Sequence, residues 1–316
     1  MAIISKDISE ASLFLRIGQL VGIPTETVYG LAANATDPKA VVKIFETKNR
    51  PDFDPLIVHI GIQSDINKWG INIHPKILEI TNALWPGPLT VVFEKSDLIP
   101  DIVSSGLDTV GIRMPNHLLT LELLRSLPFP LAAPSANPFG YISPTSAQHV
   151  EDQLGEKIPL ILDGGACDIG VESTIIQVLN NEIHVLRWGG IDEKQLSNFG
   201  LPIISATHST SKPNAPGQLT SHYAPRKPFF LGNLESLEKE HAGRRIGHLY
   251  WNKSSNSELD RTLSIDSSLR EAAHNLFGFM RELDTSSADI IIAELVPQEG
   301  LGKAINDRLK RAAAQG

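Results

Sequence analysis

A chain of 316 residues, of which 41% are hydrophobic and 20% charged, has the composition of a folded globular protein, and its length favours two domains. The single cysteine, Cys167, excludes an internal disulfide and a cysteine-rich zinc site. The formal charge of -8 comes without a basic stripe, which argues against tight autonomous binding of nucleic acid. The chain has neither a membrane-spanning run of roughly 18 to 20 apolar residues nor a basic-then-apolar leader, so we expect a cytoplasmic protein.

Short β-rich runs alternate with helical patterns over the first 200 residues. Asp37-Pro38 predicts a helix start with an aspartate N-cap and a proline at the first helical position, and His74-Pro75 predicts another. Asn180-Asn181 predicts the turn of a β-hairpin. We predict strands at 20–24, 55–60, 89–93, 109–113, 130–133 and 158–162, with hairpin arms at 173–178 and 182–188. The expected class is mixed α/β, because strict βαβ alternation is not sustained.

A linker and a second α/β unit follow. From 203 to 222, 11 of the 20 residues are Ser, Thr, Pro, Gly or Asn, a composition that builds no core. Ser268 and Glu271 have the spacing of a capping box at the start of an amphipathic helix. Strands are predicted at 229–231, 245–251 and 289–293, and a closing helix at 304–314. The predicted domains are therefore 1–202 and 226–316, with 203–225 as the linker between them.

Nucleotide-binding fingerprints of the common kinds are absent: the chain contains no G-x-x-x-x-G-K-[ST] loop and no G-x-G-x-x-G after a strand. Instead, polar residues stand just after apolar strands, where the carboxyl edge of a sheet presents side chains to a shared crevice. Each has an ordinary reading when taken alone. Lys48 and Arg50 at a helix end would offset the helix dipole, and His59 on an apolar strand would be a hydrogen-bonded core residue.

Taken together and in order, these segments resemble the YrdC-type threonylcarbamoyl-AMP synthases in their long, two-domain form. The resemblance spans nearly the whole chain. It includes P-T-E-T-x-Y-G-L at 24–31, W-P-G-P-L-T at 85–90, K-x-R at 48–50, G-I-R at 111–113, S-x-N at 135–137, E-S-T-I at 172–175, R-W-G at 187–189, A-P-G at 215–217, H-Y-A-P at 222–225, G-L-G-K-A at 300–304 and D-R-L at 307–309. The implied fold is a YrdC-like twisted mixed sheet with helices, followed by a smaller Rossmann-like α/β domain.

The resemblance also implies which residues bind the substrates. Threonine would be held by Thr27, His59, Arg113, the Ala133 backbone and Ser173. ATP would be held by Arg50, Asp54, Thr109, Ser135, Ser143, Arg187 and Tyr223, with Lys48 and Asn137 completing the basic and polar lining. Lys48 and Arg50 are the residues expected to act in catalysis. This chain departs from the family in having Asp54 where asparagine is more typical, and in the less basic stretch 218–220 after the linker Pro-Gly. An aspartate beside phosphates would repel them.

The implied reaction joins L-threonine, bicarbonate and ATP. Threonine and bicarbonate form a carbamate whose oxygen attacks the α-phosphorus of ATP, which releases pyrophosphate and yields threonylcarbamoyl-AMP. Such a step needs alignment and charge stabilisation, which suits Lys48, Arg50 and Arg187 with Mg²⁺ on the phosphates and no protein-held metal site. The product would be passed to a tRNA threonylcarbamoyltransferase complex, which modifies the adenosine next to the anticodon.

Two other functions remain as alternatives. An RNA-binding module of the same fold is the first, and the acidic first 200 residues, with 14 basic against 23 acidic side chains (14 - 23 = -9), weigh against it. Carbamoyl transfer, as in hydrogenase-maturation proteins, is the second. Those proteins carry cysteine-rich zinc fingers, which one cysteine cannot build.

The linker itself carries more than a passive tether requires. Two X-Pro steps, at Pro216 and Pro225, and the aromatic Tyr223 restrict its backbone. We therefore expect the segment to fold over the crevice of the first domain as a lid and to place Tyr223 against the nucleotide.

Overall fold

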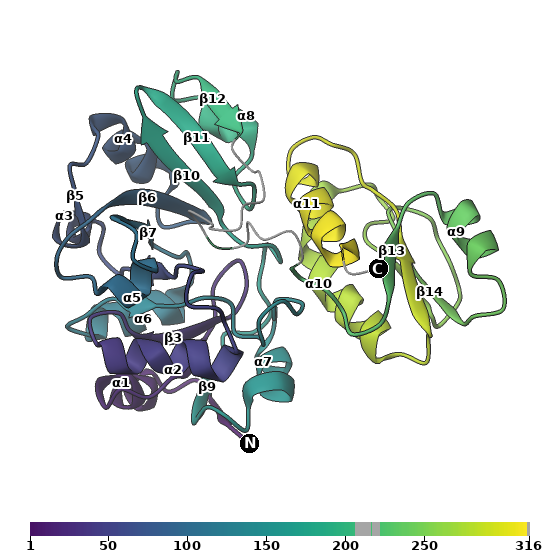
Figure 1. The fold of residues 1–316 in the computed structure, drawn as a ribbon, viewed down its shortest axis with the longest axis horizontal. Coiled ribbons are helices and arrows are strands. Elements are labelled where there is room, and N and C mark those ends of the chain that lie inside the picture. Colours follow the sequence, from purple (N-terminus) through teal and green to yellow (C-terminus); the bar gives the residue numbers. More distant parts are fainter. Residues whose placement is uncertain (206–215, 217–221, 315–316) are drawn as a thin grey trace.

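The computed structural model describes residues 1–205, 216 and 222–314, and confirms a mixed α/β fold in two units (Figure 1). The larger unit is built on a 12-stranded sheet, and the smaller one, after residue 225, on a 4-stranded sheet. Among the described residues, no helix has the length and apolar character to cross a membrane. Of the predicted linker 203–225, the segments 206–215 and 217–221 lie outside the described residues.

The large sheet mixes parallel and antiparallel pairs, in the order β1-β9-β2-β3-β8-β4-β7-β6-β10-β11-β12, with β5 paired to β6. β6 and β7 are antiparallel neighbours, whereas β4 and β7 are parallel. The strands are β1 (Ile3–Ser5), β2 (Val21–Ile23), β3 (Gly30–Asn34), β4 (Ile57–His59), β5 (Gly70–Ile71), β6 (Leu89–Lys95), β7 (Thr109–Arg113), β8 (Leu131–Ala132), β9 (Leu160–Leu162), β10 (Thr174–Leu179), β11 (Glu182–Arg187) and β12 (Ile203–Ser205).

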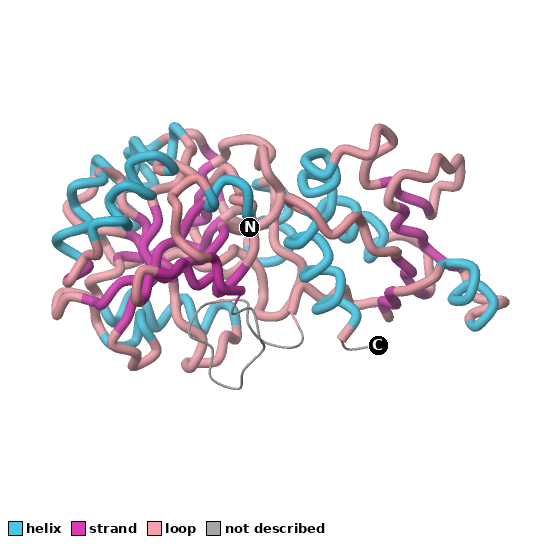
Figure 2. The backbone as a smooth tube through the Cα atoms, turned by 90° about the horizontal axis from the view of Figure 1, so that it is seen from above, coloured by secondary structure: helices cyan, strands magenta, loops and turns pink. Residues whose placement is uncertain are grey.

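Helices cover this sheet on both sides, as the view from above shows (Figure 2). In α2 the sequence signals act as predicted: the Asp37 side chain accepts a hydrogen bond from the amide of Lys39, Pro38 occupies the first turn, and Asn49 ends the helix in the left-handed conformation. The helices are α1 (Ile8–Arg16), α2 (Pro38–Lys48), α3 (Ile66–Trp69), α4 (Pro75–Leu84), α5 (Asp101–Ser104), α6 (Leu118–Ser126), α7 (Ala147–Leu154) and α8 (Glu193–Ser197), with a short 3₁₀ turn, η1 (Gln63–Asp65).

The predicted hairpin is present between β10 and β11. Asn180 and Asn181 both have positive φ, 51° and 60°, which is the backbone of a two-residue turn that matches the twist of the strands. β12 extends the sheet beyond the hairpin, pairing in parallel with β11, so the first three residues of the predicted linker belong to the sheet. Sequence reasoning did not identify β1, β3, α1, α6 or α7.

The smaller unit has a fully parallel sheet in the order β13-β16-β14-β15. Its central strand β16 is buried along its whole length, as expected of a parallel strand covered on both faces. The elements are β13 (Phe229–Leu231), α9 (Leu234–Glu240), β14 (Ile246–Tyr250), β15 (Asp260–Thr262), α10 (Leu269–Thr285), β16 (Ile290–Ala293) and α11 (Gly302–Ala313).

The predicted capping box at the start of α10 forms only by half. Ser268 accepts from the amide of Glu271 at 3.3 Å, but the reciprocal bond is missing. The Ser268 amide instead donates to Ser264 Oγ at 2.9 Å, and Ser264 Oγ donates to the Glu271 carboxylate. The prediction of a full box was wrong because a hydroxyl from the preceding loop inserts between the two partners.

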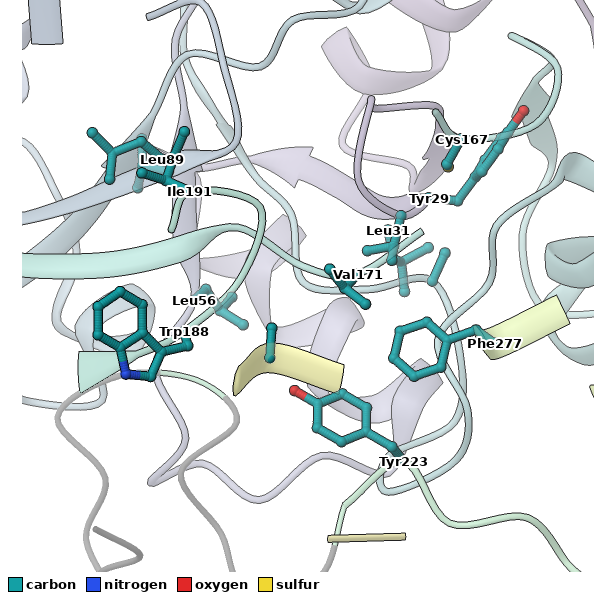
Figure 3. Close-up of a cluster of buried hydrophobic side chains, with 14 of the residues drawn as sticks. Tyr29, Leu31, Leu56, Leu89, Cys167, Val171, Trp188, Ile191, Tyr223 and Phe277 are labelled. Carbon is teal, nitrogen blue, oxygen red and sulfur yellow. The ribbon is translucent and has the colours of Figure 1, made fainter. Parts of the chain in front are cut away.

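Helices α10 and α11 lie between the two sheets and carry the contact between the units (Figure 1). Gly170 allows the close approach, since a Cβ there would stand 2.4 Å from the carbonyl oxygen of Ala273 in α10. Phe277 of α10 stacks on Tyr223, with ring centroids 5.6 Å apart, and the two belong to the same core cluster as Val171 and Tyr29 (Figure 3). The core of the large unit therefore continues into the small one.

Candidate active site

One cavity collects most of the polar residues that sequence analysis placed after strands. The cavity is narrow, with a volume of about 50 Å³. Every described residue that lines it falls between Thr25 and Tyr223, so the lining comes from the large unit and the end of the linker. The lining residues are Thr25, Val28, Gly30, Arg50, Ile57, His59, Arg113, Ala133, Pro134, Ser135, Glu172, Ser173, Arg187, Pro216, His222 and Tyr223.

The segment between β2 and β3 is a tight polar turn held by Thr25. The Thr25 hydroxyl donates to the carbonyl of Val28 at 2.6 Å and accepts from the amides of Thr27 and Val28. Its oxygen also lies 2.8 Å from Thr27 Oγ1. Thr25 and Val28 reach the cavity, whereas Thr27, the predicted threonine ligand, is fully buried and does not line it.

Arg113 and His59 stand side by side because the parallel strands β7 and β4 end in register there. Nη2 of Arg113 lies 2.8 Å from Oε2 of the buried Glu26, a close ion pair without hydrogen-bond geometry. His59 Nδ1 lies 3.2 Å from the carbonyl oxygen of Ile57, which can only accept, so Nδ1 carries a proton. Burial, followed by the charge of Arg113, lowers the pKa of His59 to about 3. The site thus presents one guanidinium beside one neutral imidazole.

Lys48 lies beneath the cavity rather than in its lining. Its ammonium donates to the carbonyl of Ser135 at 2.6 Å and to the carbonyl of Asn137, while the Asn137 amide donates to the carbonyl of Tyr141 at 2.8 Å. Burial and the neighbouring charge of Arg50 lower the pKa of Lys48 well below its usual value. Lys48 therefore anchors the 135–137 turn, which brings Ser135 to the cavity.

Arg50 lines the cavity and at the same time neutralises Asp54. Its guanidinium donates to the carbonyls of Asp54 and Pro55 at 3.0 and 2.8 Å, and Nη2 lies 2.9 Å from Asp54 Oδ2. Burial raises the pKa of the Asp54 carboxyl, although Arg50 opposes this shift. Asp54 is fully buried and does not line the cavity, so its charge is compensated by Arg50 behind the wall.

Arg187 and Ser173 form the opposite wall, at the ends of β11 and β10. Arg187 donates to the Ser173 carbonyl from Nε and Nη2, at 3.2 and 2.9 Å, and to the carbonyl of Pro216 from Nη1. Gly189 makes this wall compact, because a Cβ at that position would stand 2.1 Å from the carbonyl oxygen of Glu172. Burial lowers the pKa of Arg187.

Glu172 and His222 also line the cavity, and sequence reasoning assigned a role to neither, although both belong to motifs it had singled out. Glu172 accepts a hydrogen bond from the hydroxyl of Ser143 at 2.6 Å. His222 packs edge-on against Tyr223, with ring centroids 4.1 Å apart, and burial and the charge of Arg50 lower its pKa well below the usual value. Their positions in E-S-T-I and H-Y-A-P were the signal that could have identified them.

The predicted site residues thus divide into three sets by position. Arg50, His59, Arg113, Ala133, Ser135, Ser173, Arg187 and Tyr223 line the cavity together. Thr27, Lys48, Asp54, Asn137 and Ser143 are buried around it. Thr109 begins β7, at the opposite end of that strand from Arg113, and pairs with Glu94 outside the cavity lining. Of the linker 203–225 that was expected to fold over the crevice as a lid, 206–215 and 217–221 lie outside the described residues.

The described residues contain no group of three or more His, Cys, Asp or Glu side chains placed to hold a metal ion. Mg²⁺ commonly binds through substrate phosphates and only one or two carboxylates, so such a cage is not required for ATP chemistry. Three buried carboxylates around the cavity, Glu26, Asp54 and Glu172, are each paired with an arginine.

Comparisons with known proteins identify the family of this chain. Residues 13–189 match the family model Sua5_yciO_yrdC, described as Telomere recombination, and residues 178–314 match the model of the threonylcarbamoyl-AMP synthase C-terminal domain. A threonylcarbamoyl-AMP synthase of Pyrococcus abyssi is 37% identical over 96% of this chain and 93% of its own length. One from Bacillus subtilis is 38% identical over 97% of this chain and 92% of its own length.

A solved structure covers both units. The crystal structure of P. abyssi Sua5 complexed with L-threonine has a TM-score of 0.91 to this chain at 36% identity, over 99% of this chain and 97% of that one. Similarity of sequence and fold thus extends through the large unit, the linker ends and the small unit. The chain belongs to the threonylcarbamoyl-AMP synthase family, in its two-domain form.

Proposed function

We propose that this chain forms threonylcarbamoyl-AMP and pyrophosphate from L-threonine, bicarbonate and ATP. The observation that supports this most is the convergence of three arginines, Arg50, Arg113 and Arg187, with Ser135 and Ser173 on one cavity. The substrates carry a carboxylate, a carbamate and a triphosphate, and arginine suits the recognition of all three groups. Relatives that match the whole chain bear the name of this activity.

Threonine would bind at the ends of β4, β7 and β10. Arg113 presents its guanidinium there, and Nε has no hydrogen-bond partner in the structure, so it can pair with the substrate carboxylate. Neutral His59 and the hydroxyl of Ser173 can each form hydrogen bonds to threonine without adding charge. Thr27 would act from behind the wall, through its contact with Thr25.

The phosphates of ATP would bind between Arg50 and Arg187. A carbamate oxygen attacks the α-phosphorus, the bond from the α-phosphorus to the bridging oxygen breaks, and pyrophosphate leaves. Both arginines stabilise the charge that develops on the phosphoryl oxygens, and Mg²⁺ bound to the phosphates would share that charge. Lys48 acts indirectly, because it holds the turn that carries Ser135. Asp54 does not add repulsion, since Arg50 neutralises it.

The test is to identify the products formed from ATP, bicarbonate and L-threonine by chromatography. We expect pyrophosphate and threonylcarbamoyl-AMP in equal amounts, and neither product when threonine or bicarbonate is omitted. L-serine should be the strongest competing substrate, because a missing methyl group is worth only about 1 to 3 kcal/mol of discrimination. Pyrophosphate release that continues without threonine would contradict the proposal.

The product would be consumed by a tRNA threonylcarbamoyltransferase complex in the cytoplasm. Acyl adenylates of this kind are reactive, which favours transfer soon after release. The alternative of an RNA-binding module is not favoured, because the full-length relatives are named as synthases. A filter-binding titration with tRNA at several salt concentrations, run beside the product assay, separates the two functions.

A further inference from the structure

Arg308 of α11 is a fully buried guanidinium that the small unit inserts into the large one. Its Nε donates to Oε2 of Glu172 at 3.0 Å, and its Nη1 donates to the carbonyl oxygen of Trp188 at 2.8 Å. Glu172 lies 136 positions earlier in the chain, at the wall of the cavity. The guanidinium therefore stands directly behind the candidate active site, although the residues described as lining the cavity all precede α11.

Of the buried carboxylates in this site, Glu172 is the one that lines the cavity. It is buried, lines the cavity, and accepts the Ser143 hydroxyl through Oε1, so both of its oxygens are engaged. A buried carboxylate without a cation is costly, and it would repel the phosphates proposed to bind a few ångströms away. Arg308 supplies a positive charge from the side opposite the cavity.

Arg308 also contacts the aromatic ring of Tyr223. Its guanidinium carbon lies 5.3 Å from the centre of the ring, which also stacks on Phe277 of α10. Tyr223 has φ of 64°, a left-handed conformation that a tyrosine rarely adopts and that persists only when surrounding contacts hold it. The small unit thus contacts Tyr223 through two side chains, Arg308 from α11 and Phe277 from α10, of which Figure 3 shows Phe277.

Arg308 stays protonated in this environment. Burial opposes it, but Tyr223, Glu172 and Asp307 more than offset that effect and raise the pKa of the guanidinium above its usual value. Nη2 is buried and has no hydrogen-bond partner in the structure. Arg308 therefore keeps a donor in reserve beside the wall of the cavity.

We propose that Arg308 is a positioning residue through which the small unit completes the ATP site: it holds Glu172 and Tyr223 in place and cancels the negative charge of Glu172. This rests on the proposed use of ATP. If Arg308 only held the two units together, it would stabilise the fold without affecting the affinity for ATP. Lys303 offers the matched comparison, since it also lies on α11 and pairs with a glutamate of the large unit, Glu193, but both side chains of that pair are partly in solvent.

The experiment compares wild type with Arg308→Gln, Arg308→Lys, Glu172→Gln, the double variant Arg308→Gln/Glu172→Gln, and Lys303→Gln as control. Calorimetry measures the Kd of ATP, a pyrophosphate assay measures KM for ATP and for threonine, and thermal unfolding measures Tm. We expect Arg308→Gln to weaken ATP binding by about 10- to 100-fold, the scale for stranding one partner of a buried charge pair, with less than about a threefold change in the KM of threonine.

Two comparisons decide whether Arg308 positions residues of the ATP site or only holds the two units together. Removing the Glu172 charge in the double variant should recover the part of ATP binding that the uncompensated Glu172 charge costs in Arg308→Gln, and Lys303→Gln should match wild type. An unchanged Kd for ATP in Arg308→Gln, or a double variant no better than Arg308→Gln, overturns the inference. If Arg308→Gln does not fold, Arg308→Lys, which keeps the charge but cannot reach both Glu172 and Trp188, should weaken ATP binding by an intermediate factor, and wild-type affinity there also overturns it.

The same data keep the two proposals apart. A wild type that binds ATP but forms no product from the three substrates contradicts the proposed function, and the calorimetric comparison still decides the role of Arg308. Product formation by wild type with unaltered ATP binding in the Arg308 variants contradicts only the further inference.

Discussion

The two units of this protein bury their charged side chains in different places. In the large unit, the buried charges gather around the cavity, at Lys48, Arg50, Arg113, Glu172 and Arg187. In the small unit, the four-stranded sheet has an apolar interior, and the buried charges sit on α10 and α11, at Arg281, Asp284, Arg308 and Arg311. Helices α10 and α11 are also the ones that face the large unit.

The contacts of these helices explain the difference. Arg281 donates to the carbonyl oxygens of Ile142 and Ser143, and Asp284 accepts the hydroxyl of Tyr141 at 2.6 Å. A regular parallel sheet has its polar backbone satisfied internally and has no need of buried ions. Among the described residues, the buried charged side chains named above thus lie either at the cavity or in the contact between the two units. Arg308 belongs to both groups.

The strongest test of the comparison is at the cavity. Arg113→Met would leave Glu26 buried without its partner 2.8 Å away, and we expect the free energy of unfolding to fall by about 3 to 5 kcal/mol. Urea unfolding monitored by tryptophan fluorescence measures this. Adding Glu26→Gln should recover most of the loss, whereas a loss below about 1 kcal/mol in Arg113→Met would mean that Glu26 does not depend on this cation.

Next in size is the effect of the buried cations on turnover. Arg50→Ala and Lys48→Ala should each lower kcat by about 10² or more, the scale for removing a positioned electrostatic stabiliser. For Lys48 the cause is indirect, because the turn that carries Ser135 loses its anchor. Pyrophosphate release under saturating substrates is the measurement, and exposed Lys76→Ala is the control. Wild-type turnover with unchanged Tm in both variants would mean that neither residue contributes to catalysis and that both only offset the dipole of α2.

A smaller effect concerns pH, and it arises from the cavity side of the molecule. The pKa of His59 is lowered to about 3 and that of His222 lies well below its usual value, so both stay neutral in the fold while the unfolded chain takes up protons below about pH 6.5. Stability is therefore present above that pH and is lost as the pH falls. Each histidine should contribute a slope approaching about 1.4 kcal/mol per pH unit.

Urea unfolding at pH 7, 6 and 5 checks this slope. His59→Asn should remove its share of the slope while the remainder persists. A free energy of unfolding that stays constant between pH 7 and 5 would show that neither histidine is held neutral by the fold.

The smallest effect is expected at an exposed ion pair of the small unit, between Arg261 and Glu282. Both side chains are partly in solvent, so Arg261→Gln should change the free energy of unfolding by less than about 1 kcal/mol and leave turnover unaltered. The same urea and pyrophosphate assays apply. A loss as large as that of Arg113→Met would remove the distinction between charges at the cavity and charges at the surface.

Local features were predictable from the sequence because their causes are local. Asp37 and Pro38 start α2 through a side-chain cap and a preset backbone angle, and Asn180-Asn181 forms its turn because asparagine tolerates positive φ. The strand 109–113 was predicted with the bounds that β7 has. The order of short motifs along the chain was likewise sufficient to identify the family, which the comparisons confirm.

Only the tertiary structure could decide how deeply each side chain lies relative to the cavity and which residue it pairs with. Lys48 and Arg50 are two residues apart, yet one anchors a turn below the cavity and the other lines it, because the chain leaves α2 at Asn49 in a left-handed turn. Thr109 and Arg113 share a strand but occupy its two ends. The pairing of Glu172 with Arg308 joins the two units across 136 positions. No local sequence pattern could predict this pair, because it depends on how α11 packs against the large unit.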